Sequence, residues 1–168
     1  METSKYELEY SENFGKILRP KVLARIINPL TGDFIDVRCY VDTGADISLL
    51  PQSAGKRINL DVECGKRAVF RGISQKKECS VEAYIHEVKI RLCEHEFESL
   101  MAFSPVEDLP PLVGRLKALD YFEICLNGKE IKFKYLTPIF AKCLSIIITP
   151  YFLLFLILEK VKINRALA

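Results

Sequence analysis

Short runs of alternating apolar and polar residues follow one another along most of the chain. Residues 21–28 (KVLARIIN) are rich in β-branched side chains, and residues 34–41 (FIDVRCYV) place an apolar side chain at every second position. Between them, residues 28–33 (NPLTGD) are rich in turn-forming residues. Alternation with a period of two is typical of a strand with one buried face, so these runs predict an antiparallel β-hairpin.

Other segments of the chain repeat this pattern. Further strands are predicted at residues 67–70, 81–92 and 97–103. The dipeptide Asn127-Gly128 separates two apolar runs, EICL and KEIKF, and predicts a tight hairpin in which both turn residues have positive φ. One short helix is predicted over residues 115–122 (RLKALDYF), whose apolar side chains fall on one helical face. Many short strands with few helices predict a mainly β fold, a small barrel or sandwich.

The most apolar part of the chain is residues 136–158 (LTPIFAKCLSIIITPYFLLFLIL), in which Lys142 is the only charged residue. A helix that spans a membrane needs about 20 mostly apolar residues. The segment therefore predicts a C-terminal hydrophobic helix that anchors the protein in a membrane and contacts lipid, followed by a basic tail at 159–168. The alternative is a buried helix or strand pair that belongs to the soluble domain.

Composition narrows the class of protein. The 168 residues are 49% hydrophobic and 27% charged, which excludes a disordered or collagen-like chain. The 24 basic and 22 acidic residues nearly balance, which argues against nucleic acid as a partner. The six cysteines form no C-x-x-C pair, which disfavours zinc and thioredoxin-like sites. Residues 1–15 are polar, show no secretory signal and predict a loose arm, so reduced thiols in a cytosol are expected.

Candidate chemistry lies at the end of the first predicted hairpin, in residues 41–51 (VDTGADISLLP). A strand delivers the carboxylate of Asp42 directly into a turn, and a second apolar strand leaves at once. Gly44 permits a tight turn and a close approach of the backbone to the carboxylate. Thr43 offers a hydroxyl that can brace this turn. An apolar strand on each side makes this Asp-Thr-Gly far more specific than the tripeptide alone.

This motif resembles the active-site motif of the retropepsin-like aspartic proteases, the single-domain relatives of retroviral proteases. A second stretch, residues 112–115 (LVGR) followed by LKALDYFEI, resembles the apolar-apolar-Gly-Arg segment of the family and the helix after it. Residues 70–73 (FRGI) lie between the two motifs, where the family has its flap, the hairpin that closes over the substrate. The resemblance covers residues 21–135 and implies a small closed β-barrel of the retropepsin type in a domain at 16–135.

The chemistry that the resemblance implies agrees with the residues. Hydrolysis by carboxylates needs two of them that share one proton, because like charges held close together cannot both ionise. The chain has one such motif, so a complete site would take Asp42 from each of two copies in a homodimer. One carboxylate would activate a water and the other would polarise the scissile carbonyl of a polypeptide substrate. This mechanism needs no metal and no cofactor.

The resemblance also implies roles for the neighbouring residues. Thr43, which with Asp42 and Gly44 forms the catalytic motif, would hydrogen-bond across the two-fold axis. Arg115 would pair with Asp46 and tie the segment that begins at Gly114 to the active-site loop. The residues implied to contact the substrate are Gly44, Ala45, Asp46, Gly72 and Ile73.

Two other functions remain open on the sequence. The fold could serve as a catalytically inactive dimerisation or peptide-binding module at a membrane, which the charged, glycine-poor flap at residues 70–78 favours and the intact motif at residues 42–44 opposes. Alternatively, the protein could be a small membrane receptor with a β-domain. For the protease, the absence of a secretory signal predicts a cytoplasmic catalytic domain that residues 136–158 anchor as a single pass.

Overall fold

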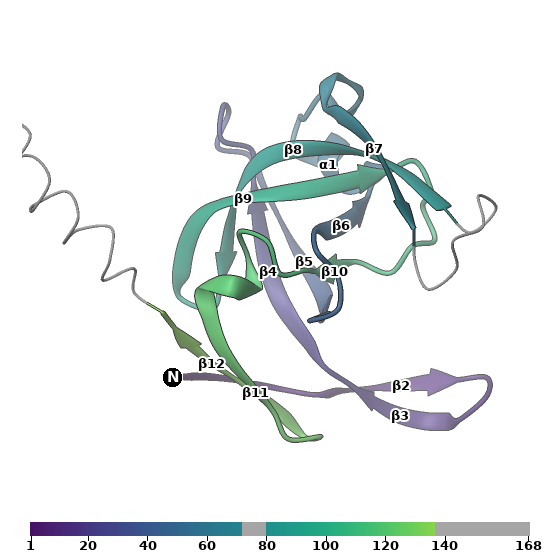
Figure 1. Ribbon diagram of the computed structural model, residues 1–168, viewed down its shortest axis with the longest axis vertical. Helices are drawn as coiled ribbons and strands as arrows, with labels where there is room; N and C mark the ends of the chain where they lie inside the picture. The colour runs from purple at the N-terminus through teal and green to yellow at the C-terminus, as the bar shows by residue number, and fades with distance from the viewer. Residues whose placement is uncertain (72–79, 137–168) are drawn as a thin grey trace, which may run out of the picture. The chain divides into compact units, whose positions relative to one another are not determined.

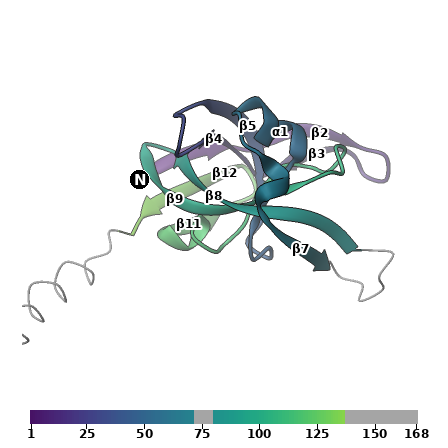
Figure 2. The same cartoon turned by 90° about the horizontal axis from the view of Figure 1, so that it is seen from above.

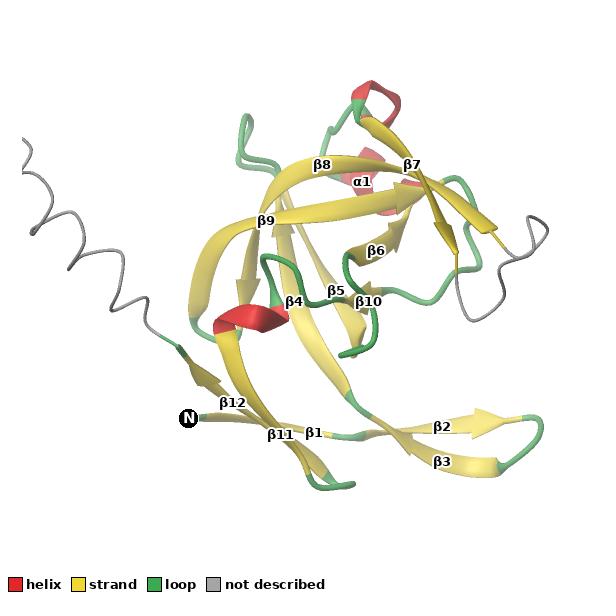
Figure 3. Cartoon of the chain, in the orientation of Figure 1, coloured by secondary structure: helices red, strands yellow, loops and turns green. Residues whose placement is uncertain are grey.

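Strands make up most of the chain that the computed structural model describes, which is residues 1–71 and 80–136 (Figures 1 and 3). The strands are β1 (Glu2–Lys5), β2 (Glu7–Ser11), β3 (Gly15–Arg19), β4 (Lys21–Ile27), β5 (Phe34–Val41), β6 (Ser48–Pro51), β7 (Lys66–Arg71), β8 (Ser80–Leu92), β9 (His95–Ser104), β10 (Leu112–Val113), β11 (Phe122–Leu126) and β12 (Glu130–Tyr135). The helices are α1 (Gln52–Arg57) and two 3₁₀-helices at Val62–Cys64 and Leu119–Tyr121. The prediction of a mainly β fold is therefore confirmed.

The largest sheet has seven strands and closes on itself. Its order is β4-β5-β10-β6-β9-β8-β7, and β4 also pairs with β8, which completes a ring of six strands. β7 lies outside this ring, because it pairs only with the first half of β8 (Figures 1 and 2). The predicted hairpin is confirmed, since β4 and β5 pair antiparallel from Lys21 opposite Tyr40 to Ile27 opposite Phe34.

The core lies inside this ring and follows the alternation in the sequence. β4 buries Val22, Ala24 and Ile26, which are its apolar residues at every second position. β5 contributes Cys39, which is fully buried. Burial raises the pKa of the Cys39 thiol to about 12, so this cysteine stays protonated and packs as a small apolar residue. The four cysteines within the described residues are all free thiols.

The prediction of a helix over residues 115–122 is wrong for its first half. Lys117 has a positive φ of 54°, which ends any regular helix there, and only the 3₁₀-helix Leu119–Tyr121 follows. Helical spacing suggested that Leu116 is buried together with Leu119, but Leu116 is 49% exposed. The chain's α-helix within the described residues is α1 instead, where the sequence analysis predicted no helix.

Residues 1–15 are not the loose arm that the sequence suggested. β1 pairs antiparallel with β12, from Glu2 opposite Phe133 to Lys5 opposite Glu130, and β11 completes this three-stranded sheet. β2 and β3 form a hairpin of their own. The sequence did not predict these strands, because polar residues such as Glu2 and Lys5 leave the segments with little alternation of apolar and polar side chains.

The turn between β11 and β12 lies where the sequence predicted it, but it works differently. Gly128 has a positive φ of 82°, whereas Asn127 does not. Instead, the Asn127 side-chain oxygen accepts hydrogen bonds from the backbone N–H groups of Lys129, at 3.0 Å, and Glu130, at 2.9 Å. Asn127 therefore pairs with Glu130, and its side chain caps a two-residue loop formed by Gly128 and Lys129.

The strands described above belong to one compact unit, Met1–Tyr135. The predicted anchor at residues 136–158, apart from Leu136, and the basic tail at 159–168 lie outside the described residues. Within residues 1–71 and 80–136, no helix has the length and hydrophobicity to cross a membrane. Gly72 and Ile73, which were expected to contact substrate, also fall outside the described part of the chain.

Candidate active site

Asp42 follows directly on β5, at the end of a strand that is paired on both sides. Its backbone N–H donates to the carbonyl of Val113 in β10, at 3.1 Å, and the N–H of the preceding Val41 donates to Pro20, at 2.9 Å. Oδ1 of the Asp42 carboxylate accepts the N–H of Gly44, at 2.9 Å. The described residues offer Oδ2 no hydrogen bond. The hydrogen bond to Oδ1 thus fixes the orientation of the carboxylate, and Oδ2 is available to bind another group.

Gly44 is required by the close approach of its own loop to this carboxylate. A Cβ at position 44 would lie 3.3 Å from Oδ1 of Asp42, which is tighter than an ordinary van der Waals contact. A side chain there would displace the carboxylate or lengthen its hydrogen bond to the loop. Glycine at this position therefore serves the placement of Asp42, as the sequence analysis inferred.

Gly114 has an even tighter environment, behind the same loop. A Cβ at this position would lie 2.5 Å from the carbonyl carbon of Ile47 and 3.0 Å from the carbonyl oxygen of Ala45. The Gly114 N–H also donates to the buried hydroxyl of Ser48, at 3.1 Å. The absence of a side chain lets the segment after β10 pack directly on the backbone of the active-site loop.

Arg115 and Asp46 form the ion pair that the resemblance implied. Nη2 of Arg115 donates to Oδ1 of Asp46, at 2.5 Å. Two backbone hydrogen bonds run beside it, from Arg115 N–H to Ala45, at 2.9 Å, and from Leu116 N–H to Asp46, at 2.8 Å. The two side chains are 46% and 74% exposed, so the backbone contacts rather than the ion pair supply most of the attachment.

A cleft of about 610 Å³ opens in front of this loop. It is lined by Asp42, Gly44, Ala45, Asp46, Ile47, Leu49, Phe70, Arg71, Val81 and Leu112. Its volume is in the range of sites that enclose small ligands or short peptide segments. The lining is mainly apolar, with the two carboxylates of the loop and the guanidinium of Arg71 as its charged groups.

The structure brings four of the predicted site residues together in the cleft: Asp42, Gly44, Ala45 and Asp46. Thr43 is exposed beside them and does not line the cleft. Gly114 and Arg115 lie behind the loop and support it, as predicted.

Six residues of the cleft wall were not predicted as site residues. Ile47 and Leu49 belong to the motif at residues 41–51, Phe70 and Arg71 end β7, Val81 is the second residue of β8 and Leu112 begins β10. Their contribution depends on pairing between distant strands, because Leu112 lies opposite Tyr40 on one side and Leu49 on the other. The resemblance placed residues 70–73 at the flap, but it did not indicate which side chains line the cleft.

The cleft holds a second carboxylate, Asp46, whose Oδ1 is bound by Arg115. The described residues show no hydrogen bond between the carboxylates of Asp42 and Asp46. The same residues contain no cluster of three or more His, Cys, Asp or Glu side chains able to hold a metal ion.

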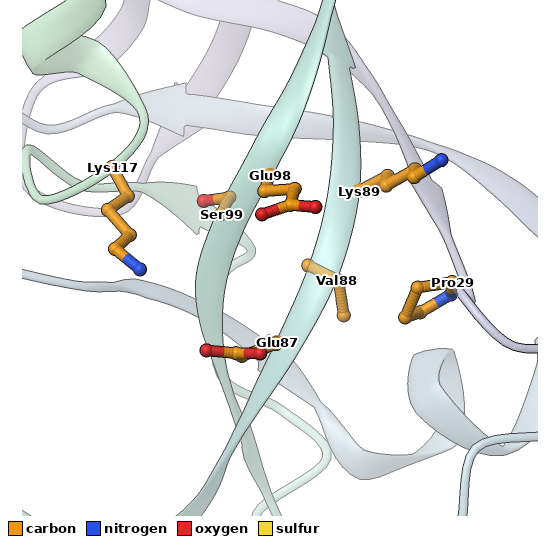
Figure 4. A pocket seen from close by; sticks show the side chains of 7 residues that line it. All are labelled: Pro29, Glu87, Val88, Lys89, Glu98, Ser99 and Lys117. Atoms are coloured by element: carbon orange, nitrogen blue, oxygen red, sulfur yellow. The ribbon is translucent and has the colours of Figure 1, made fainter. Parts of the chain in front are cut away.

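A second, smaller hollow of about 70 Å³ lies beside β8 and β9 (Figure 4). Its lining residues are Pro29, Glu87, Val88, Lys89, Glu98, Ser99 and Lys117. The two carboxylates and two amines around it balance in charge, and the hollow shares no residue with the Asp42 cleft. It holds only a few water molecules, at ~30 Å³ each, so we assign it no chemistry.

The chain matches no known protein-family model and no curated protein sequence. The resemblance to the retropepsin-like proteases therefore rests on two motifs, residues 41–51 and 112–115. In the structure these motifs meet, since the second packs on the backbone of the first.

Proposed function

We propose that the protein is an aspartic endopeptidase of the retropepsin-like type, and that its closed sheet is the barrel of that family. It cleaves peptide bonds with a water held between two Asp42 carboxylates, one from each copy in a homodimer. The observation that carries this proposal is the position of Asp42, which follows the last residue of β5 and lines the cleft. Gly114 and Arg115 support the loop that contains Asp42.

The state of the Asp42 carboxylate supports this chemistry. Oδ1 is held by the Gly44 N–H, and Oδ2 has no partner within the described residues. A carboxylate fixed in this way keeps its orientation while one oxygen accepts a proton from water or shares one with a second acid. In the dimer, one Asp42 is ionised and activates the water, and the protonated copy polarises the scissile carbonyl.

The surroundings of Asp42 support a site built from two copies. We assign the second acid to Asp42 of another chain, since no carboxylate among the described residues of the same chain hydrogen-bonds to Asp42. Thr43 is exposed next to Asp42, and its hydroxyl makes no hydrogen bond within the described residues. An unengaged hydroxyl at this point suits a contact across a two-fold axis, where the same residue meets its own copy.

The cleft suits a polypeptide substrate with apolar side chains. Ile47, Leu49 and Leu112 line the cleft on the side of the active-site loop, and Phe70 and Val81 line it from β7 and β8. Burial of apolar side chains in such a cleft provides binding energy at about 25 cal/mol per Å². In this proposal, residues 136–158 hold the catalytic domain at the cytoplasmic side of a membrane.

A catalytically inactive peptide-binding module is the second candidate, because the same apolar cleft would bind a peptide without cleaving it. The experiment that separates the two functions compares the full-length protein with Asp42→Asn on a mixed peptide pool. We expect cleavage by the wild type, its inhibition by a transition-state mimic such as pepstatin, and a loss of at least ~10⁴-fold in Asp42→Asn, because the acid–base pair is removed.

The matched control for this experiment is Asp108→Asn, which removes an exposed carboxylate outside the cleft. This control should retain full cleavage. Peptide binding without cleavage by the wild type, equal in Asp42→Asn, would favour the inactive module. Undiminished cleavage by purified Asp42→Asn would remove Asp42 from the mechanism.

A further inference from the structure

The hairpin of β2 and β3 extends from the rest of the compact unit (Figures 1 and 3). Its strands belong to a two-stranded sheet and contact mainly each other. A two-stranded hairpin in water is marginally stable by itself, so it needs further contacts to be held in place. We call residues 7–19 the arm.

One face of the arm is attached to the strands that lead to the active site. The Tyr40 hydroxyl donates to the carboxylate of Glu9, at 2.5 Å, and the amine of Lys21 donates to the same carboxylate. Arg38 pairs with Glu7, at 3.2 Å. Tyr40 is two residues before Asp42, so the arm is rooted beside the catalytic loop.

The opposite face of the arm is apolar and uncovered within the described chain. Leu8 and Leu18 lie directly opposite each other across the two strands, and they are 63% and 49% exposed. Tyr10 continues this face at 79% exposed, and Phe14 in the turn is 77% exposed. Four neighbouring exposed apolar side chains on one small sheet are typical of an interaction surface rather than of ordinary solvent-facing residues.

We propose that this apolar face of the arm, formed by Leu8, Tyr10, Phe14 and Leu18, is a docking surface for a second copy of the same chain. The proposal rests on the homodimer of the proposed function, and it names the surface that holds the two halves of the site together. The root of the arm at Tyr40 places its contact surface in continuity with the loop that must meet its own copy.

The surface supplies part of the area that a stable contact with a second copy buries, and the loop around Thr43 has to supply the rest. A stable interface buries about 800 Å² per partner. Tyr10 and Phe14, at 150–250 Å² per aromatic side chain, offer roughly 300 Å² in their exposed state, and the two leucines add to this. Lys16 lies opposite Tyr10 on the same face, and Glu12 lies in the turn between β2 and β3, so a two-fold axis can bring the cation of one copy to the anion of the other.

The test measures the association of the full-length protein by sedimentation equilibrium, with every variant in the same density-matched detergent. The main variant is Leu8→Thr with Leu18→Thr, because a cross-strand threonine pair retains the pairing of β2 and β3 while removing the apolar surface. Phe14→Ser, in the turn, is a second variant that leaves both strands untouched. Leu30→Thr is the matched control, since Leu30 is 91% exposed in the turn between β4 and β5.

We expect the double threonine variant to raise the dimer Kd at least about a hundredfold and Phe14→Ser to raise it about tenfold. Leu30→Thr should leave the Kd unchanged, and the thermal unfolding of all variants should match the wild type at a concentration at which every protein is monomeric. A double variant that associates like the wild type would overturn the proposal. So would a wild type that stays monomeric but binds lipid vesicles through the same four side chains.

Association is measured without substrate, so the two proposals can fail separately. A dimer that the arm controls but that cleaves no peptide would leave the arm surface in place and contradict the protease. Conversely, cleavage that depends on Asp42 in a dimer insensitive to the arm variants would support the protease and overturn the arm surface.

Discussion

Gly114 shows how one missing side chain can let a segment pack directly on the backbone of the loop that follows Asp42. A Cβ at this position would lie 2.5 Å from the backbone of Ile47, which leaves no room for any other residue unless the loop moves. The contact is with backbone rather than with a flexible side chain, so it cannot be relieved by a change of rotamer.

We expect Gly114→Ala to abolish peptide cleavage and to lower the free energy of unfolding by about 1–3 kcal/mol through overpacking. Gly32→Ala is the control, because Gly32 has a positive φ of 80° but open space around its Cβ, in the turn at the opposite end of β5 from Asp42. That control should lose a similar amount of stability through backbone strain while retaining cleavage. Full activity in Gly114→Ala would show that the loop does not depend on this contact.

The Asp46–Arg115 ion pair contributes less to the free energy of unfolding than the close packing of Gly114. Both side chains are substantially exposed, at 74% and 46%, so water screens their attraction. A double-mutant cycle with alanine at each position, followed by urea denaturation, should give a coupling of about 0.2–1 kcal/mol. A coupling near zero would mean that the backbone hydrogen bonds alone join the two segments.

At the scale of elements, the sequence predicted those parts whose pattern is local. The β4–β5 hairpin followed from the β-branched residues of 21–28, the turn residues of 28–33 and the alternation of 34–41, and β7, β8 and β9 lie within a few residues of their predicted bounds. The helix predicted over residues 115–122 is missing in its first half, because Lys117 has a left-handed backbone, and only the 3₁₀-helix Leu119–Tyr121 follows. Pairings such as β1 with β12 join the two ends of the compact unit and leave no local signal.

The contact of the Glu9 carboxylate with Lys21 and Tyr40, which holds the arm against β4 and β5, depends on pH. Hydrogen bonds from Lys21 and Tyr40 hold the pKa of the Glu9 carboxyl below its ordinary value of 4.5. A carboxyl whose pKa is lowered in the folded state stabilises that state while ionised. This contribution is fully present above about pH 4.5 and is lost as the pH falls through the lower folded-state pKa.

We therefore expect Glu9→Gln to cost about 1 kcal/mol of unfolding free energy at pH 7. The difference from wild type should shrink as the pH falls below 4.5, where the wild-type carboxyl also becomes neutral. Urea denaturation of both proteins at several pH values measures this difference, with Glu12→Gln in the exposed turn as the control. A gap between Glu9→Gln and wild type that stays constant down to pH 2.5 would contradict the role of the Glu9 charge.

At the scale of the whole molecule, the sequence predicted the centre of the site better than its walls. Asp42, Gly44 and Asp46 could be placed because one strand and one turn carry them. Phe70 and Arg71 were predicted only as part of a flap at residues 70–73, because their position in the cleft wall depends on the pairing of β7 with β8. In the proposed function each active site contains Asp42 from two copies, so a single chain cannot form a complete site.

The measurement that tests this claim most directly mixes the wild type with Asp42→Asn at a fixed total concentration and follows peptide cleavage after the chains have exchanged. If each site needs two intact carboxylates, activity falls as the square of the wild-type fraction, so an equal mixture retains about a quarter of the activity. If one chain carries a complete site, activity falls in proportion and the equal mixture retains about half. A linear decline would contradict the shared site, whereas a quadratic one is the result that we predict.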